Sequence, residues 1–333
     1  MTQHPPDSEV FAIGVDVGAT KIAAALVSAA GRVHHSRQVP TAPERGPSSV
    51  LDSITTLVEA LRAQAPAAPL GVGIGTPGRV DAAAGIVYNA VNLGWDEVHL
   101  AAEIRARLPV DLPIWLQKDA NAAALGEYYF GAAKDCHDFV YVSIGSGLGA
   151  GVLAGGTLIT GANWNAAELG HVTLDPGGLA CACGRRGCAE TVVSGPGLLA
   201  LAQRYLAEAR HPTRLPAPAA LTNEAILAAA RAGDVLALAA LAEVGRHLGL
   251  VMAACVAVLD PARIVIGGGL GLAAFDFLAP PARAALERLT LAAGAHQLAI
   301  VPSRLPSSAV GAASLVWYFT RHDAHRTGGT GGP

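Results

Sequence analysis

Two stretches of the chain can be laid over each other, Val15-Asp-Val-Gly-Ala-Thr-Lys-Ile-Ala-Ala-Ala-Leu26 and Val142-Ser-Ile-Gly-Ser-Gly-Leu-Gly-Ala-Gly-Val-Leu153. In each, a short apolar run ends at a glycine-containing turn and a second apolar run follows, which is typical of a β-hairpin. Any hairpin can look like this, so the repeat alone is weak evidence, and its value depends on the residues between the two copies. The functional interpretation is a duplicated lobe, in which a glycine turn lets backbone N–H groups approach a phosphate.

The residues around these turns suit the binding of a nucleotide. Thr20 offers a hydroxyl and Lys21 a positive charge, whereas Asp16 suits the water shell of Mg²⁺, which prefers one or two carboxylates. The second turn, Gly145-Ser-Gly147, repeats the backbone donors without the charges. A third glycine turn, Gly267-Gly-Gly269, follows an apolar run. Three such turns favour phosphate binding over three ordinary bends.

Length and composition limit the classes of protein that the chain can represent. Its 333 residues predict two domains or lobes, and 52% hydrophobic residues supply ample core. The net charge of −3 argues against nucleic acid or an anionic membrane as a partner. The N-terminal residues lack the pattern of a signal peptide, and the longest apolar run, 248–259, reads as a buried helix, so we expect a cytoplasmic protein.

Hydrophobic periodicity predicts an alternating α/β chain. The expected strands are 11–17, two strands within 21–40 around a turn at Gly31, 70–78 ending in a Pro-Gly turn, 112–117, the hairpin 138–156, 262–271 running into a glycine turn, and a strand near 300. The expected helices are 48–64, 96–108, 120–131, most of 196–260 and 308–320. The Gly-rich residues at the C-terminus, 323–333, read as a disordered tail.

Asp119 lies where an expected strand ends and a helix begins. Aspartate is a favoured helix N-cap, so the residue can be purely structural. The carboxyl end of a strand is also where open α/β sheets hold reactive groups, and a carboxylate there can accept a proton from an attacking hydroxyl. Position alone does not choose between these interpretations.

Three of the five cysteines, Cys181, Cys183 and Cys188, follow His171 within 17 residues. Together they make a Cys₃His set, one of the tetrahedral combinations of structural zinc sites. A redox-active thiol pair and a chance cluster of buried thiols are the alternatives. Glu168 and Glu190 flank the set, and a bound metal would aim both carboxylates, which are strong acceptors for sugar hydroxyls. Cys136 and Cys255 read as core residues.

Taken together, these motifs resemble the ROK family (repressor, open reading frame, kinase) of bacterial sugar kinases, in the actin-like, hexokinase-type ATPase superfamily. The matching pieces occur in family order, and they are Asp16-x-Gly-x-Thr-Lys21, Gly75-Thr-Pro-Gly78, Asp119-Ala-Asn-Ala-Ala-Ala-Leu-Gly-Glu127, Glu168-x-Gly-His171, Cys181-x-Cys-Gly-x-x-Gly-Cys-x-Glu190 and Ile266-Gly-Gly-Gly269. The pair formed by Glu-x-Gly-His and the cysteine segment is highly specific to this family.

The resemblance implies a role for each matching residue. Asp119 would be the base that deprotonates the 6-hydroxyl of the sugar, and His171 would contact both zinc and sugar. The sugar site would comprise Gly78, Lys118, Asn121, Glu168, His171 and Glu190. ATP and Mg²⁺ would meet Asp16, Gly18, Thr20, Lys21, Gly145, Ser146, Gly147, Gly267, Gly268 and Gly269, and structural Zn²⁺ would be held by His171, Cys181, Cys183 and Cys188.

Three residues depart from the family pattern. Lys118 stands where the kinases usually have an asparagine that binds the sugar, and its charge favours the ionised form of Asp119. Trp164 and Ala167 stand where family members commonly have glycine. These departures bear on the identity of the sugar more than on the reaction.

The resemblance implies a two-lobed α/β actin-like (ribonuclease H-like) fold with a cleft between the lobes. We expect a small lobe of residues 1–118 with about 306–322, and a large lobe of 119–305. The predicted function is that of an ATP-dependent hexose kinase, with a glucokinase as the first candidate. Because homodimers are common in the family, the resemblance also implies a homodimer. A kinase for another hexose or an N-acetylhexosamine, polyphosphate as donor, and a non-catalytic sugar sensor related to ROK repressors are the alternatives.

Overall fold

The computed structural model describes residues 10–208, 212–291 and 297–327. These residues form two compact units. Unit 1 contains residues 10–135, 160–165 and 304–327, and unit 2 contains 136–159 and 166–303 with the gaps above. The lobe boundary expected after residue 118 stays a prediction, and in the structure the helix that follows it belongs to unit 1.

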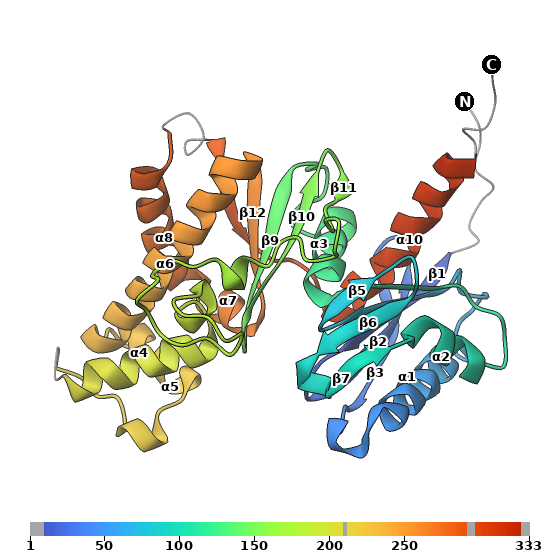
Figure 1. Cartoon of the computed structure of the whole chain (residues 1–333), viewed down its shortest axis with the longest axis horizontal. Helices are drawn as coiled ribbons and strands as arrows, with labels where there is room; N and C mark the ends of the chain where they lie inside the picture. The colour runs from blue at the N-terminus through green and yellow to red at the C-terminus, as the bar shows by residue number, and fades with distance from the viewer. Residues whose placement is uncertain (1–9, 209–211, 292–296, 328–333) are drawn as a thin grey trace. The chain divides into compact units, whose positions relative to one another are not determined.

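Unit 1, which carries the labels β1, β2 and β3 in Figure 1, is built on a five-stranded mixed sheet. The strand order is β3-β2-β1-β4-β8. Strands β1 to β3 are antiparallel, whereas β4 and β8 continue the sheet parallel to β1. The strands are β1 (Phe11–Val17), β2 (Lys21–Ser28), β3 (Val33–Pro40), β4 (Val72–Thr76) and β8 (Ile114–Lys118). The helices are α1 (Pro47–Arg62), α2 (Leu100–Arg107), α3 (Asp119–Phe130) and α10 (Ser308–Thr327).

The helices of unit 1 cover the sheet because of their apolar faces. In α1, the buried residues recur at helical spacing, as the sequence predicts. Helix α10 packs on β1 and β4 so closely that a Cβ on Gly14 would lie 1.9 Å from the carbonyl oxygen of Ala309. A side chain on either strand at this crossing would therefore push the helix away. Because α10 runs to Thr327, it includes part of the stretch expected as a tail, and 328–333 lie outside the described residues.

A small three-stranded antiparallel sheet of unit 1 was not predicted. It consists of β5 (Arg79–Asp81), β6 (Ile86–Ala90) and β7 (Trp95–Val98). The last strand occupies residues expected to begin the helix 96–108, which starts only at Leu100. The buried ring of Trp95 and the pairing of β7 with β6 fix these residues as a strand, a long-range effect that helical periodicity does not report.

Unit 2 repeats the sheet of unit 1, with the order β11-β10-β9-β12-β13. Again an antiparallel hairpin is extended by two parallel strands. The strands are β9 (Phe139–Ile144), β10 (Leu148–Ala154), β11 (Thr157–Leu158), β12 (Arg263–Gly267) and β13 (Ala299–Pro302). The duplicated hairpin read from the sequence is therefore present in both units.

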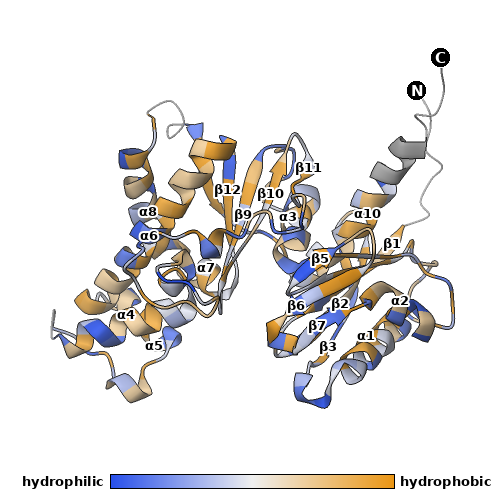
Figure 2. Ribbon diagram, viewed as in Figure 1, coloured by the Kyte–Doolittle hydropathy of each residue, from blue (hydrophilic) through white to orange (hydrophobic). Residues whose placement is uncertain are grey.

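The helices of unit 2 supply most of its core. They are α4 (Gly195–Ala207), α5 (Asn223–Arg231), α6 (Val235–Leu259), α7 (Gly269–Ala273) and α8 (Phe275–Leu289). Helix α6, which packs on α4, α5 and α8, is apolar along most of its length (Figure 2). Among the described residues it is the one helix long and apolar enough to cross a membrane, but more than half of its apolar stretch is buried, as predicted for a core helix.

Candidate functional site

Two predicted site carboxylates of unit 1 lie at the carboxyl ends of β1 and β8, the two parallel strands on either side of β4. Asp16 is near the end of β1 and pairs with Gly75 of β4, while Asp119 directly follows β8. A Cβ on Gly75 would lie 3.7 Å from Asp16 Oδ1 and 3.6 Å from the Cα atom of Asp119. The bare glycine thus separates two acidic residues, at the edge where open α/β sheets bind ligands.

The carboxylate of Asp16 is held by a residue far away in the sequence. The hydroxyl of Ser308, at the start of α10, donates a hydrogen bond of 2.5 Å to Asp16 Oδ2. Burial raises the pKa of Asp16, and the Ser308 hydrogen bond and the charge of Lys21 partly offset that effect. The predicted turn closes through a hydrogen bond from the Gly18 amide to the Lys21 carbonyl, and the side chains of Thr20 and Lys21 are exposed.

The junction of β8 and α3 orders the predicted base. Lys118, not Asp119, occupies the N-cap position, and Asp119 is the first residue of the helix. Its Oδ1 accepts a hydrogen bond from the Ala120 amide at 2.6 Å, while the side chain stays exposed. Lys118 is buried, so the departure from the family pattern lies inside the protein. The N-cap role considered for Asp119 is therefore wrong.

Asn121, two residues after Asp119, is buried. Its Nδ2 donates to Gln117 Oε1 at 3.0 Å, whereas its Oδ1 is buried without a hydrogen-bond partner. A buried amide oxygen left unpaired costs free energy, which suits a site that a polar ligand or a water completes. Gly78, the remaining predicted sugar residue of unit 1, forms the turn between β4 and β5 with a φ of 92°.

In unit 2, two predicted phosphate turns lie side by side. The turn Gly145–Gly147 joins β9 to β10, and Gly267 to Gly269 run from the last residue of β12, the parallel neighbour of β9, to the first residue of α7. Gly268 has a φ of 79°, and a Cβ there would lie 2.4 Å from the carbonyl oxygen of Ile144. Glycine is required by both the backbone conformation and the contact, so the two turns are held together.

Glu190 contacts the first of these turns. Its Oε2 accepts a hydrogen bond from the Leu148 amide at 2.9 Å, and a Cβ on Gly147 would lie 2.4 Å from the same oxygen. The residue predicted to meet the sugar therefore also fixes a phosphate turn. Glu168 is an exposed residue that precedes the short helix η3 (Leu169–His171), and Gly170 of η3 lies against Leu148.

The four predicted metal ligands converge. One nitrogen or sulfur atom from each of His171, Cys181, Cys183 and Cys188 lies within 4.8 Å of the others. Cys181 Sγ is 3.8 Å from His171 Nδ1, and Cys183 Sγ is 3.6 Å from Cys188 Sγ. Tetrahedral zinc, with bonds of about 2.3 Å to sulfur and about 2.0 Å to nitrogen, separates neighbouring ligand atoms by about 3.5–3.8 Å. The cluster therefore fits zinc.

Local pairing brings these ligands together. Thr173 and Cys188 form an antiparallel bridge, and the Ala189 amide donates to the carbonyl of Val172. The backbone N–H of Arg185, with its guanidinium, lowers the pKa of Cys183 to about 6, which favours the thiolate that binds metal. Burial instead raises the pKa of Cys255 to about 12, so this thiol is the inert core residue that the sequence predicts.

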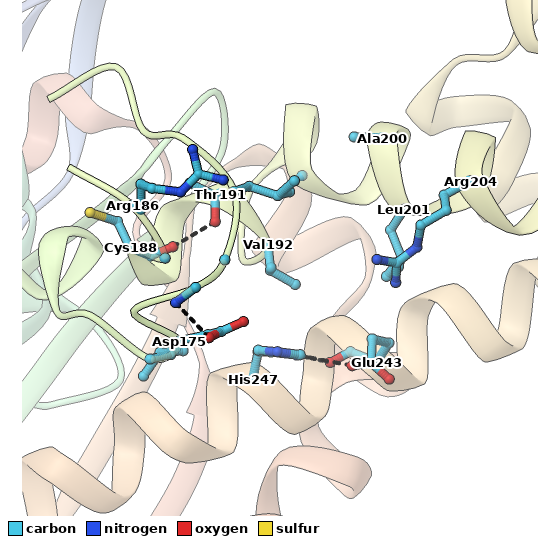
Figure 3. A pocket seen from close by; sticks show the side chains of 16 residues that line it. Asp175, Arg186, Cys188, Thr191, Val192, Ala200, Leu201, Arg204, Glu243 and His247 are labelled. Carbon is cyan, nitrogen blue, oxygen red and sulfur yellow. Dashed lines mark hydrogen bonds and ion pairs between the residues drawn. The ribbon is translucent and has the colours of Figure 1, made fainter. Parts of the chain in front are cut away.

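A pocket of about 530 Å³ lies within unit 2, beside the loop that carries Cys181, Cys183 and Cys188 (Figure 3). Asp175, Arg186 and Cys188 of the loop line one side, and Glu243 and His247 of α6 line another. Burial lowers the pKa of His247, whose Nδ1 lies 3.4 Å from a Glu243 carboxylate oxygen. Of the predicted site residues, Cys188 alone is among the described residues that line this pocket.

Comparison with known proteins assigns the family. The sequence profile of the ROK family matches residues 12–318, a span that contains every motif described above. The chain belongs to the ROK family. Its membership also explains why the hairpin turns, the acidic junction and the cysteine loop occur in one protein, in this order.

Relatives of this chain within the ROK family include sugar kinases. A glucokinase of Streptomyces coelicolor is 35% identical over 312 residues, which cover 91% of this chain and 96% of that protein. An N-acetylmannosamine kinase of Escherichia fergusonii is 34% identical over 261 residues, or 78% and 84% of the two chains. The crystal structure of a ROK glucokinase from Streptomyces griseus in complex with glucose and AMPPNP has a TM-score of 0.78 at 33% identity and covers 92% of this chain and 98% of that one.

These matches confirm both the resemblance to ROK sugar kinases and the predicted α/β actin-like fold class, seen here as two five-stranded mixed sheets. The roles assigned to individual site residues stay predictions.

Three features of the ROK site were missed from the sequence. Ser308 reaches Asp16 across 292 positions, and no local pattern reports such a contact. Asn223, with a buried Oδ1 that has no partner, stands 2.8 Å from a Cβ built on Gly195, whose amide bonds to the turn at Gly145. The third feature is the stacking of the Trp164 ring on Tyr88. The sequence pointed to this position only because Trp164 stands where family members commonly have glycine.

Proposed function

We propose that this ROK-family protein is an ATP-dependent hexose kinase that phosphorylates the 6-hydroxyl of its sugar, with glucose as the first candidate. The observation that carries the proposal is the pair Asp16 and Asp119 across Gly75, at the carboxyl ends of β1 and β8. One carboxylate beside a phosphate turn and one at a strand–helix junction are what phosphoryl transfer from a nucleotide to a hydroxyl requires.

In the proposed reaction, Asp119 accepts the proton of the 6-hydroxyl while the sugar oxygen attacks the γ-phosphorus of ATP. A new O–P bond forms as the bond to ADP breaks, and the bonding electrons leave with the ADP oxygen. Asp16 would hold the hydrated Mg²⁺ that neutralises the phosphate charge. Backbone donors of Gly18 and of the turns at Gly145 and Gly267 would bind the phosphates.

The sugar residues proposed for this protein are Gly78, Lys118, Asn121, Glu168, His171 and Glu190. Zinc on the Cys₃His cluster would be structural, because four protein ligands leave no open position. With Nδ1 of His171 turned toward Cys181, Nε2 is the nitrogen left for the sugar. Zinc would thereby fix the histidine and, two residues after Cys188, the carboxylate of Glu190.

Glucose is supported by the glucokinases among the relatives, at 32–35% identity. N-acetylmannosamine is the second candidate, since kinases for that sugar are 34% identical. A non-catalytic sugar sensor is favoured by one observation, the buried Lys118 beside the proposed base. A cytoplasmic homodimer that uses ATP rather than polyphosphate completes the proposal.

The test is ADP production from Mg·ATP across a panel of hexoses and N-acetylhexosamines, with polyphosphate as an alternative donor. Glucose-dependent turnover that falls at least about a hundredfold in Asp119→Asn is the expected result. Turnover with another sugar alone would keep the mechanism and change the substrate. Sugar binding by calorimetry without turnover of any sugar would sink the kinase and favour the sensor.

A further inference from the structure

An aromatic and cationic stack lies on one face of the three-stranded sheet of unit 1. Arg79 of β5 and Tyr88 of β6 are directly opposite each other in the antiparallel pair. The guanidinium carbon of Arg79 is 4.8 Å from the centroid of the Tyr88 ring and 5.8 Å from that of Trp164. The rings of Tyr88 and Trp164 are 6.4 Å apart and inclined by only 16°. The three side chains therefore form one cation–π cluster.

The cluster holds two groups in unfavourable states. Trp164 has a φ of 57°, in the left-handed region that a bulky side chain rarely adopts. Arg79 Nε is buried and has no hydrogen-bond partner. Strain of this kind persists only where surrounding contacts fix it, and it gathers at functional sites. A glycine at position 164 would adopt the same backbone without strain but could not make the stack.

The cluster also joins two segments to which sugar-binding residues belong in the proposed function. Arg79 directly follows Gly78, and Trp164 precedes Glu168 by four positions. Residues 160–165 are part of unit 1, although the chain on either side of them belongs to unit 2. The Trp164 ring is thus the point at which this short segment is attached to the β5–β6 hairpin.

We propose that Trp164 is a positioning residue for sugar binding, which acts by anchoring residues 160–165 to Arg79 and Tyr88. With the segment anchored, the three residues between Trp164 and Glu168 have fewer conformations to lose when a sugar binds, so affinity rises without a direct contact. The proposal rests on the proposed sugar site. It assigns to this chain's tryptophan a role that a glycine cannot fill.

The test compares Trp164→Gly with Trp164→Phe and Ala167→Gly. The phenylalanine keeps an aromatic ring on the stack. Ala167 also has a positive φ, of 62°, so its glycine variant adds comparable flexibility to the residues just before Glu168 and relieves the same kind of strain but leaves the stack intact. For each variant, KM and kcat are measured for the sugar that the wild type turns over best. Calorimetry gives the dissociation constant of that sugar, and thermal unfolding gives the midpoint.

Trp164→Gly is expected to raise KM and the dissociation constant about three- to tenfold, with kcat within about twofold. Trp164→Phe and Ala167→Gly should stay within about twofold of the wild type in both constants. The unfolding midpoint of Trp164→Gly should not fall below that of Trp164→Phe, because the backbone strain is relieved. A stack that serves only packing would instead lower the midpoint and leave KM unchanged.

An unchanged sugar affinity in Trp164→Gly overturns the proposal while the kinase stands, and so does an equal loss in Ala167→Gly, which would assign the effect to backbone flexibility. Sugar binding without turnover in the wild type refutes the kinase, and the dissociation constants still decide the role of Trp164. A wild type that binds none of the panel sugars overturns both.

Discussion

The two five-stranded sheets share one strand order and one set of directions, yet their hairpin turns differ in chemistry. The turn after β1 carries its own carboxylate and cation, Asp16 and Lys21. The turn after β9 has only backbone donors and Ser146, and its carboxylate comes from Glu190, 42 positions after the Leu148 amide that it binds. A duplicated backbone therefore supplies two glycine turns that we propose to bind phosphate, and only the turn after β1 has charged side chains of its own.

The source of the carboxylate determines what each turn depends on. Asp16 lies on a buried strand and is held by Ser308 at the start of α10. Glu190 lies in the short 3-10 helix η4 (Ala189–Thr191), two residues after a predicted zinc ligand. We expect the first turn to be sensitive to charge and pH, and the second to depend on the metal that orders its loop.

The largest effect should come from the built-in carboxylate. Asp16→Asn is expected to lower kcat about a hundredfold or more, because it removes the proposed link to Mg²⁺. Ser143→Ala, at the overlaid position in β9, should stay within about threefold. Steady-state kinetics at several Mg²⁺ concentrations measure both. Similar losses in the two variants would mean that the turns are not chemically distinct.

Gly268, which lies against Ile144 just before the turn at Gly145, should be sensitive to substitution. Gly268→Ala is expected to lower the free energy of unfolding by about 2–3 kcal/mol, since a Cβ there combines a φ of 79° with overlap on Ile144. In Gly269→Ala the new Cβ meets nothing within 4 Å, so the change should be under about 0.5 kcal/mol. Urea unfolding tests the pair, and equal values would contradict this sensitivity.

Removal of a metal ligand should disturb the turn that takes its carboxylate from Glu190. Cys188→Ala is expected to lose bound zinc and to reduce kcat/KM for the sugar about tenfold or more. Cys255→Ala, which alters a buried thiol of α6 outside the cluster, should keep its zinc. Metal analysis by mass spectrometry and kinetics are the measurements. Full activity in a zinc-free Cys188→Ala protein would refute the dependence.

The smallest effect should be a shift of the pH profile. The Ser308 hydroxyl lowers the pKa of Asp16 against the raising effect of burial. Ser308→Ala therefore leaves that pKa higher, so less of the active carboxylate form is present at a given acidic pH. We expect kcat near pH 6 to fall about two- to fivefold and the acid limb to move to higher pH. If the acid limb of the pH profile does not move, or if Ser307→Ala at the neighbouring exposed position shifts it equally, the proposed effect of Ser308 on Asp16 is wrong.

Local patterns predicted most of the elements. The helical spacing in α1, the apolar run in α6 and the glycine-bounded strands β1, β9 and β12 all appear where the sequence indicated. The strand β7 was missed because its residues precede a true helix without a turn signal. Its conformation depends on pairing with β6, and a local pattern of apolar residues does not report such pairing.

The candidate site divides in the same way. The ligand set around His171 could be read directly, because metal sites are defined by residue type and the three cysteines are close in sequence. The partners that hold the site could not be read. Gln117, near the end of β8, accepts a hydrogen bond from Asn121 only four positions later. By contrast, Ser308, Leu148 and the Arg79–Tyr88 pair meet their partners only after segments distant in sequence have packed together.

The sequence by itself determined that this is a duplicated α/β protein with glycine turns, an acidic strand–helix junction and a Cys₃His loop. Those features depend on local backbone preferences and on residue type, which a linear chain displays. Only the tertiary structure decided that Ser308 holds Asp16, that Glu190 serves the second turn and that Trp164 rests on Arg79. Each of these contacts exists because strands and helices distant in sequence pack together, and packing geometry is a property of the fold and not of any one segment.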